Sequence, residues 1–156
     1  MSKPFIALLA ALAAISMIAA GCGGGDSTDS SSLTKAEFVK QGNALCAKGN
    51  KEINQGFEEF AKENGFSEKQ KPTKAQMTEV IETVVIPGIR GQVEGIEGLE
   101  PPSGEEAKVE AITDAANEAL EKGEEDPAVL TSQKAGPFAK ADKLASAYGL
   151  VKCGEE

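Results

Sequence analysis

The sequence contains no histidine and no tryptophan, and its 156 residues include one tyrosine, Tyr148, and one arginine, Arg90. Histidine is the usual general acid–base near neutral pH and a frequent metal ligand, so its absence removes most familiar catalytic and metal-binding arrangements. An Asp-rich loop of the spacing that binds calcium is also missing. We therefore predict a protein that is not an enzyme and that holds no metal ion and no cofactor.

Positive charge is scarce as well, and the formal net charge is −9. An acidic chain is repelled by nucleic acid and by anionic lipid surfaces, so we expect no nucleic-acid partner. Carboxylates recur in pairs at helical spacing, for example Glu79 with Glu82 and Glu94 with Glu97. Acid–base catalysis needs carboxyl groups in a pocket, and we assign these pairs to solvated helix faces.

The longest apolar run covers residues 5–20 and follows Lys3. At a rise of about 1.5 Å per residue it is shorter than the roughly 20 residues that span a bilayer comfortably. A basic start, an apolar centre and small residues at its end are typical of a secretory signal peptide, which we place at residues 1–21. An uncleaved membrane anchor is the alternative.

The end of this run, Ala19-Ala20-Gly21-Cys22, resembles the lipobox of bacterial lipoproteins, although Ala19 stands where leucine is commonest. The resemblance implies that Cys22 carries a diacylglyceryl group, with fatty acids such as palmitate, and becomes the new N-terminus. The protein would then be extracytoplasmic and anchored to the bacterial cell membrane by lipid. The alternative is ordinary secretion with Cys22 lost or free. Residues 22–32 would comprise the lipidated cysteine and a flexible Gly/Ser linker with a reach of about 17 Å.

The remainder, residues 33–156, carries repeated helix-start signals. Thr34 and Thr73 each stand three residues before a Glu or Gln, the pattern of a capping box, and Ser103 is placed in the same way. Apolar residues at helical spacing and glycine stops predict helices over residues 35–64, 74–99, 104–122 and 137–149, with a short turn at 127–130. We therefore predict an all-α domain, a small antiparallel bundle of about four helices.

Two features of these helices need a packing explanation. The second helix has two apolar stripes that differ in phase by about one residue at about 100° per residue, and Pro87 lies between them. Because proline breaks the hydrogen-bond ladder, we predict a helix that is kinked at Pro87 or divided there into two pieces. In the first helix Gly42, Gly49 and Gly56 recur every seven residues. They reflect either the close approach of a neighbouring helix or composition alone.

With Cys22 assigned to lipid, two cysteines remain, Cys46 and Cys153. In an oxidising compartment such a pair is most simply a disulfide. In an up-down bundle the last helix ends where the first begins, so the tail before Cys153 must lie back along the first helix. Closing this long loop would stabilise the fold by roughly 4 to 5 kcal/mol. Two buried free thiols and an intermolecular bridge are the alternatives.

The sequence leaves two classes of function open. The first is a non-catalytic binding module whose partner is a protein or a small ligand, and the second is a structural cell-envelope lipoprotein with no small-molecule site. A cavity of roughly 300 Å³ or more would favour ligand binding, whereas an exposed apolar patch would favour a protein partner. Arg90 could bind an anionic ligand group, but we expect an ion pair with Glu94. The cysteine early in the first helix, Cys46, and the ending Ala147 to Gly154 resemble those of small secreted actinobacterial helical lipoproteins, a resemblance that implies no activity.

Overall fold

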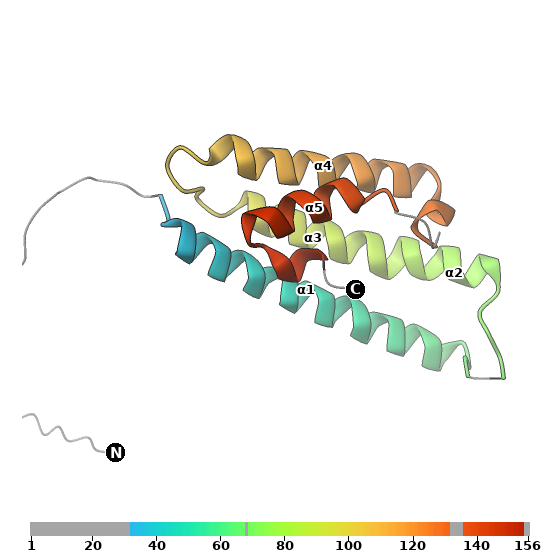
Figure 1. The fold of residues 1–156 in the computed structure, drawn as a ribbon. Coiled ribbons are helices and arrows are strands. Elements are labelled where there is room, and N and C mark those ends of the chain that lie inside the picture. Colours follow the sequence, from blue (N-terminus) through green and yellow to red (C-terminus); the bar gives the residue numbers. More distant parts are fainter. Residues whose placement is uncertain (1–31, 68, 132–135, 155–156) are drawn as a thin grey trace, which may run out of the picture.

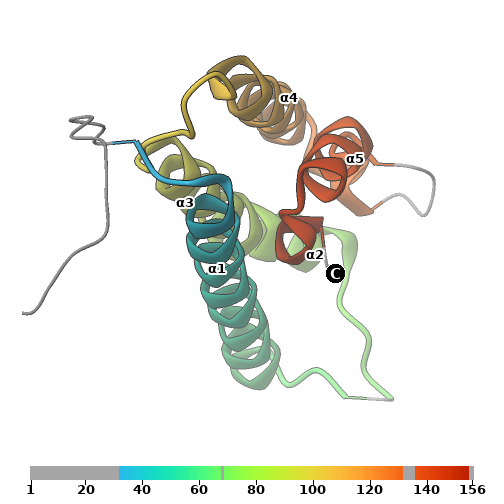
Figure 2. The ribbon, with the colours of Figure 1, turned by 60° about the vertical axis from the view of Figure 1, so that its left-hand side comes forward.

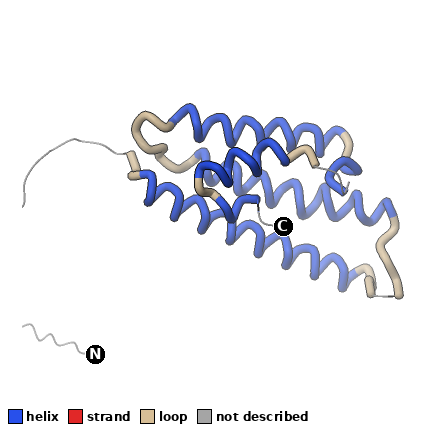
Figure 3. Tube along the Cα trace, in the orientation of Figure 1, coloured by secondary structure: helices blue, strands red, loops and turns tan. Residues whose placement is uncertain are grey.

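The structure, a computed structural model, describes residues 32–67, 69–131 and 136–154. Its elements in chain order are α1 (Lys35–Glu63), α2 (Lys74–Val80), the π-helical η1 (Ile81–Val85), α3 (Ile86–Glu97), α4 (Glu106–Glu125), the 3₁₀-helical η2 (Pro127–Thr131), α5 (Ala139–Tyr148) and the 3₁₀-helical η3 (Val151–Gly154). Helices and loops account for the whole described part of the chain, without strands (Figure 3). The predicted small all-α bundle is thereby confirmed. The predicted signal peptide, Cys22 and residues 23–31 of the linker lie outside the described residues.

The helices form an incomplete ring. α1 packs on α3, α3 on α4 and α4 on α5. Figure 1 shows the long helices side by side, and Figure 2 shows the C-terminal turn between α5 and α1. This turn, η3, contacts both α5 and α1 and completes the ring, so the last helix reaches the first chiefly through the chain that follows it.

The helix starts follow the predicted capping chemistry at two of three positions. Thr34 Oγ1 accepts a hydrogen bond from the Glu37 backbone N–H at 3.3 Å, and the Glu37 carboxylate accepts one from the Thr34 N–H at 3.0 Å. Thr73 has the same reciprocal capping box. The prediction that Ser103 caps the next helix was wrong. Gly104 turns the chain with a φ of +78°, and α4 begins two residues later than a Ser103 cap requires.

The irregularity of the second helix is a π-helical segment that ends just before Pro87. The backbone N–H of Ile86 donates to Ile81 O, five residues back, and Pro87 follows without an N–H of its own. A π turn contains about one more residue than an α turn, which matches the phase offset between the two apolar stripes. The predicted interruption is therefore present, but it takes the form of an added residue, and α2, η1 and α3 remain one continuous rod (Figure 1).

Gly49 and Gly56 of α1 mark close approach to the rod formed by α2, η1 and α3, whereas a Cβ atom on Gly42 would meet Leu150 first, at 2.5 Å, and Ile96 next, at 3.0 Å. A Cβ atom on Gly49 would clash with the side chain of Gln92, and one on Gly56 would lie 2.6 Å from Val84 Cγ1. The rod contributes the same kind of contact, since a Cβ on Gly88 would clash with Ile53. Helix packing, and not composition alone, explains these positions.

The core consists of two apolar clusters. The first lies toward the start of α1 and is built from Phe38, Cys46, Ile96, Val109, Ile112, Ala145, Tyr148 and Leu150. The second lies between η1, α3, α4 and α5 and is built from Ile81, Ile86, Val93, Ala115, Ala116, Leu120 and Ala141. Leu150 is fully buried although it lies beyond the last long helix, so the C-terminal tail belongs to the core.

Candidate functional site

The C-terminal tail fills the seam between α1 and α5. α5 ends at Gly149 with a φ of +113°, and the Leu150 N–H donates to Ala145 O at 2.8 Å in a Schellman arrangement. Because Gly149 turns the chain back, residues 150–154 run along α1; we call them the strap. The sequence predicted both this ending and the direction of the tail.

Covalent and polar contacts hold the strap on α1. Cys46 and Cys153 form a disulfide with a Cα–Cα separation of 4.8 Å, as predicted. Asn43 donates to Gly149 O at 2.9 Å and accepts from the Lys152 N–H at 2.8 Å. Asn50, two turns further along α1, donates to Lys152 O at 2.9 Å.

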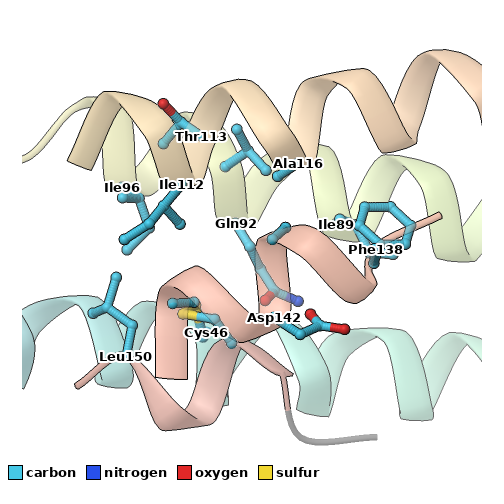
Figure 4. Close-up of a pocket in the computed structure, with 14 residues that line it drawn as sticks. Cys46, Ile89, Gln92, Ile96, Ile112, Thr113, Ala116, Phe138, Asp142 and Leu150 are labelled. Atoms are coloured by element: carbon cyan, nitrogen blue, oxygen red, sulfur yellow. A yellow bond between two sulfur atoms is a disulfide. The ribbon is translucent and has the colours of Figure 1, made fainter. Parts of the chain in front are cut away.

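Two adjoining spaces lie beside the strap, in the region shown in Figure 4. The inner cavity has a volume of about 60 Å³ and lies between α1, α3, α4 and α5. The outer cleft has a volume of about 260 Å³ and lies between α1, the η1–α3 rod, η2, α5 and the strap. Both spaces are bordered by Ile89, Gln92, Phe138, Asp142 and Cys153. The disulfide is therefore part of the wall of the site.

The walls of these spaces are mostly apolar. The inner cavity is lined by aliphatic side chains of α3 and α4 and by Leu150 of the strap. The apolar walls of the outer cleft come from η1, α3, η2 and the approach to α5, together with Ile53 of α1. These residues are Ile53, Val85, Ile89, Leu130 and Phe138.

Gln92 is the polar exception in the middle of this wall. Its residue exposure is 8%, and it lines both the inner cavity and the outer cleft. Its Nε2 donates to Asn50 Oδ1 at 2.9 Å, and Figure 4 shows its amide directed toward the side of the pocket where Asp142 lies. Thr113, the other buried polar side chain of the inner cavity, is satisfied locally, since its hydroxyl donates to Glu110 O at 3.2 Å.

Ionisable groups are sparse inside the site. Of the described residues that line the inner cavity or the outer cleft, Asp142 alone has an ionisable side chain. Lys51, Glu58 and Lys152 lie outside the cleft, along an open polar groove that continues from Asn50 and Asn54 on α1. Among the described residues that line the two spaces there is therefore no pair of ionisable side chains.

A charged cluster closes the other end of the α1–α5 seam. Lys108 Nζ lies 2.8 Å from Glu105 Oε1, and Lys35 Nζ lies 3.3 Å from Glu105 Oε2. The hydrogen bond from Lys108, and then the proximity of the Tyr148 hydroxyl, lower the pKa of Glu105 to about 2. Burial, and then the neighbouring Glu105, raise the pKa of Tyr148.

The same cluster includes an aromatic contact. Lys35 Nζ lies 4.5 Å from the centroid of the Tyr148 ring, and this ring meets Phe38 edge to face at 5.8 Å. The Tyr148 hydroxyl lies beside the carboxylate but makes no hydrogen bond of normal geometry with the described residues. The cluster joins the starts of α1 and α4 to the end of α5 and is remote from the outer cleft, which shares none of its residues.

Arg90 does not line either space. It forms an ion pair with Glu124 across the α3–α4 interface. The prediction of an ion pair with Glu94 was therefore wrong. Helix packing brings α4 alongside α3, so a residue distant in sequence replaces the neighbour one turn away. Glu94, Glu97 and the other predicted surface pair, Glu79 with Glu82, are exposed.

Sequence reasoning identified the two disulfide cysteines of this site but missed Gln92, Asn50 and Asn43. A signal existed for Gln92, because it stands three residues after Ile89 and four before Ile96 on the inward stripe of its helix. A polar residue on an apolar stripe marks either a satisfied core group or a binding position. The asparagines carried no such signal, since their partners belong to the strap and to α3.

Within residues 32–67, 69–131 and 136–154, no three side chains of the metal-binding types are placed to hold a metal ion. None of the helices in the described ranges is long and apolar enough to cross a membrane. Comparison with known proteins finds no matching family, no similar curated protein and no similar solved structure.

Proposed function

We propose that this chain is a membrane-anchored extracytoplasmic lipoprotein whose helical domain is a non-catalytic binding module for a small, largely apolar ligand. The observation that carries the binding role is the outer cleft of about 260 Å³, which adjoins the inner cavity. Ligand pockets are typically apolar concavities of about 300 to 1,000 Å³ that contain a few polar groups. The two spaces together reach the lower end of this range and have that composition.

The surface of the domain favours a small ligand over a protein partner. Val151, at 48% exposure, is the one exposed large hydrophobic residue of the described part of the chain. Stable protein interfaces usually bury more than about 1,000 Å² around an apolar centre. A single exposed valine does not supply such a centre, whereas the outer cleft already gathers five apolar side chains.

The lipid anchor rests on the sequence around Cys22. The test compares incorporation of labelled fatty acid and membrane fractionation between the wild type and Cys22→Ala in a bacterial host. We expect the variant to lose both the label and its membrane association. Cys153→Ala is the matched control, since it removes another cysteine and should keep the label. Equal labelling of the wild type and Cys22→Ala would rule out the anchor.

The binding role can be tested by fluorescence, because the chain contains no tryptophan. Phe138→Trp places a single reporter in the outer cleft, and Phe66→Trp places one against Phe60 at the far end of α1. Each full-length variant is reconstituted in lipid nanodiscs and titrated with 1-bromohexane, an apolar quencher. We expect saturable quenching of the reporter at position 138 and only weak, non-saturable quenching at position 66.

Indistinguishable quenching of the two reporters would contradict the binding role. It would favour a structural envelope lipoprotein without a small-molecule site. Circular dichroism of both variants establishes that each aromatic replacement leaves the helical fold intact.

A further inference from the structure

The buried amide of Gln92 sets a chemical requirement on whatever occupies the site. The side chain uses one Nε2 hydrogen for Asn50 Oδ1 and makes no other hydrogen bond among the described residues. A carboxamide has a second N–H and an oxygen that accepts two hydrogen bonds. Gln92 lines both spaces, so an occupant that displaces water from this amide without replacing the lost hydrogen bonds would bind less tightly than one that pairs with it.

The amide is also held in place before any ligand arrives. Gly49 lets the stem of Gln92 lie directly against α1, where a Cβ atom would clash with it. Asn50 fixes the end of the amide, and Asn50 is in turn bonded to the strap through Lys152 O. A binding group whose neighbours fix its position loses little conformational entropy when a ligand binds.

The electrostatics of the site favour an uncharged group at this amide. No lysine or arginine is among the described residues that line the two spaces, so an anionic group would lack a counter-charge and would face Asp142. A cationic group would have to share Asp142 with the partner that this residue already has within the chain. Burying a charge without a partner costs far more than burying a hydroxyl or an amide.

The remaining walls accept hydrocarbon. Val85, Ile89, Leu130 and Phe138 line the outer cleft from elements other than α1, which contributes the asparagines. A ligand can therefore place an apolar body against these side chains while one polar group contacts the carboxamide of Gln92. The size of the spaces limits that body to a short chain or a small ring system.

We propose that the ligand is a small neutral amphiphile, with a hydrocarbon body in the outer cleft and one uncharged hydroxyl or amide group held by the carboxamide of Gln92. This inference rests on the proposed binding role and specifies its ligand class. It predicts selection between head groups and not only between apolar and polar molecules.

The test uses four compounds with the same hydrocarbon chain: 1-hexanol, hexanamide, hexanoate and hexylammonium. Each is titrated calorimetrically at neutral pH into the full-length protein in nanodiscs, and titrations into empty nanodiscs are subtracted. We expect the two neutral compounds to bind at least about tenfold more tightly than either charged compound. Gln92→Leu should weaken binding of 1-hexanol and hexanamide by about 3- to 10-fold.

Two further variants separate binding from folding. Thr113→Val removes the other buried polar group of the inner cavity, whose hydroxyl is already satisfied, and should leave the head-group preference unchanged. Gln92→Met keeps an unbranched stem of similar length and should behave as Gln92→Leu does. In the Phe138→Trp background, saturable quenching by 1-bromohexane must persist in both Gln92 variants, which establishes that the cleft is intact.

The outcomes distinguish the two proposals. Equal affinity for all four compounds, tighter binding of a charged compound, or an unchanged preference in both Gln92 variants would overturn the neutral-amphiphile inference and leave the binding role in place. Absence of binding by every compound, together with no saturable quenching by 1-bromohexane, would overturn the binding role itself.

Discussion

The two sides of α1 are packed by different means. Toward α3, helix meets helix directly, and glycines such as Gly49 and Gly88 admit the partner's side chains against the backbone. Toward α5, the strap lies between the helices and is held by Asn43, Asn50 and a disulfide. The first interface depends on the absence of side chains, and the second depends on a peptide segment inserted between two helices.

This difference explains where the site lies. Glycine-lined helix contacts bring backbones close together and leave little space between them. A strap of a few residues separates α1 from α5, but it does not follow the whole length of α1. Cys153 and Gly154, the last residues of the strap that the structure describes, line the outer cleft. The cleft is therefore a consequence of how the ring is closed.

Removal of the disulfide that holds the strap on α1 should lower the free energy of unfolding more than any change at the glycine interface. Cys153→Ala opens a covalent loop with a sequence separation of 107 residues, and we expect it to lower the free energy of unfolding by roughly 4 to 5 kcal/mol. Urea unfolding followed by circular dichroism measures the change. Wild-type protein treated with reductant should match the variant, and a loss below about 1 kcal/mol would show that the strap is held mainly by its non-covalent contacts.

The glycine interface can be examined with a matched pair on α3. Gly88→Ala places a methyl group against Ile53, and overpacking of this kind costs about 1 to 3 kcal/mol. Gly91→Ala points into open space, and the gain in helix propensity should stabilise the fold by up to about 1 kcal/mol. Thermal or urea unfolding should therefore shift in opposite directions. Equal stabilisation by both alanines would show that α1 and α3 can separate without loss.

The contrast also divides what the sequence could predict from what it could not. Local signals identified the caps at Thr34 and Thr73, the stop at Gly149 and the interruption near Pro87, because each depends on neighbouring residues. The pairing of Cys46 with Cys153 followed from counting and topology. In contrast, the Arg90 partner was wrong, since Glu124 is brought there only by packing of α4.

The site itself was beyond sequence reasoning for the same reason. The position of the site depends on how far the strap holds α1 and α5 apart. No local sequence pattern encodes that separation. Gln92 illustrates the limit, because its place on an inward stripe was visible whereas its contact with Asn50 was not.

The polar attachment of the strap should contribute less than the disulfide. Asn43 makes two hydrogen bonds to the chain at the end of α5, with Gly149 O and with the Lys152 N–H. We expect Asn43→Ala to cost about 1 to 2 kcal/mol and to accelerate hydrogen exchange at the Lys152 amide. Asn54→Ala, at an exposed position on the same helix, is the control and should change neither quantity. Unchanged exchange at Lys152 in Asn43→Ala would mean that the disulfide alone positions the strap.

The smallest expected effect is a decrease in the free energy of unfolding at acidic pH, which originates in the charged cluster at the end of the α1–α5 seam. The carboxyl of Glu105 has a pKa of about 2 in the fold against 4.5 for the unperturbed group. A carboxyl with a lowered pKa stabilises the fold above the higher value, and this contribution disappears as the pH falls from about 4.5 toward 2. The free energy of unfolding should therefore decrease across that window, and Glu105→Gln should make the decrease shallower. Glu110→Gln, an exposed position on α4, should follow the wild type. A wild-type slope in Glu105→Gln would show that Phe38 and Tyr148 hold this end of the seam by packing, without help from the charged cluster.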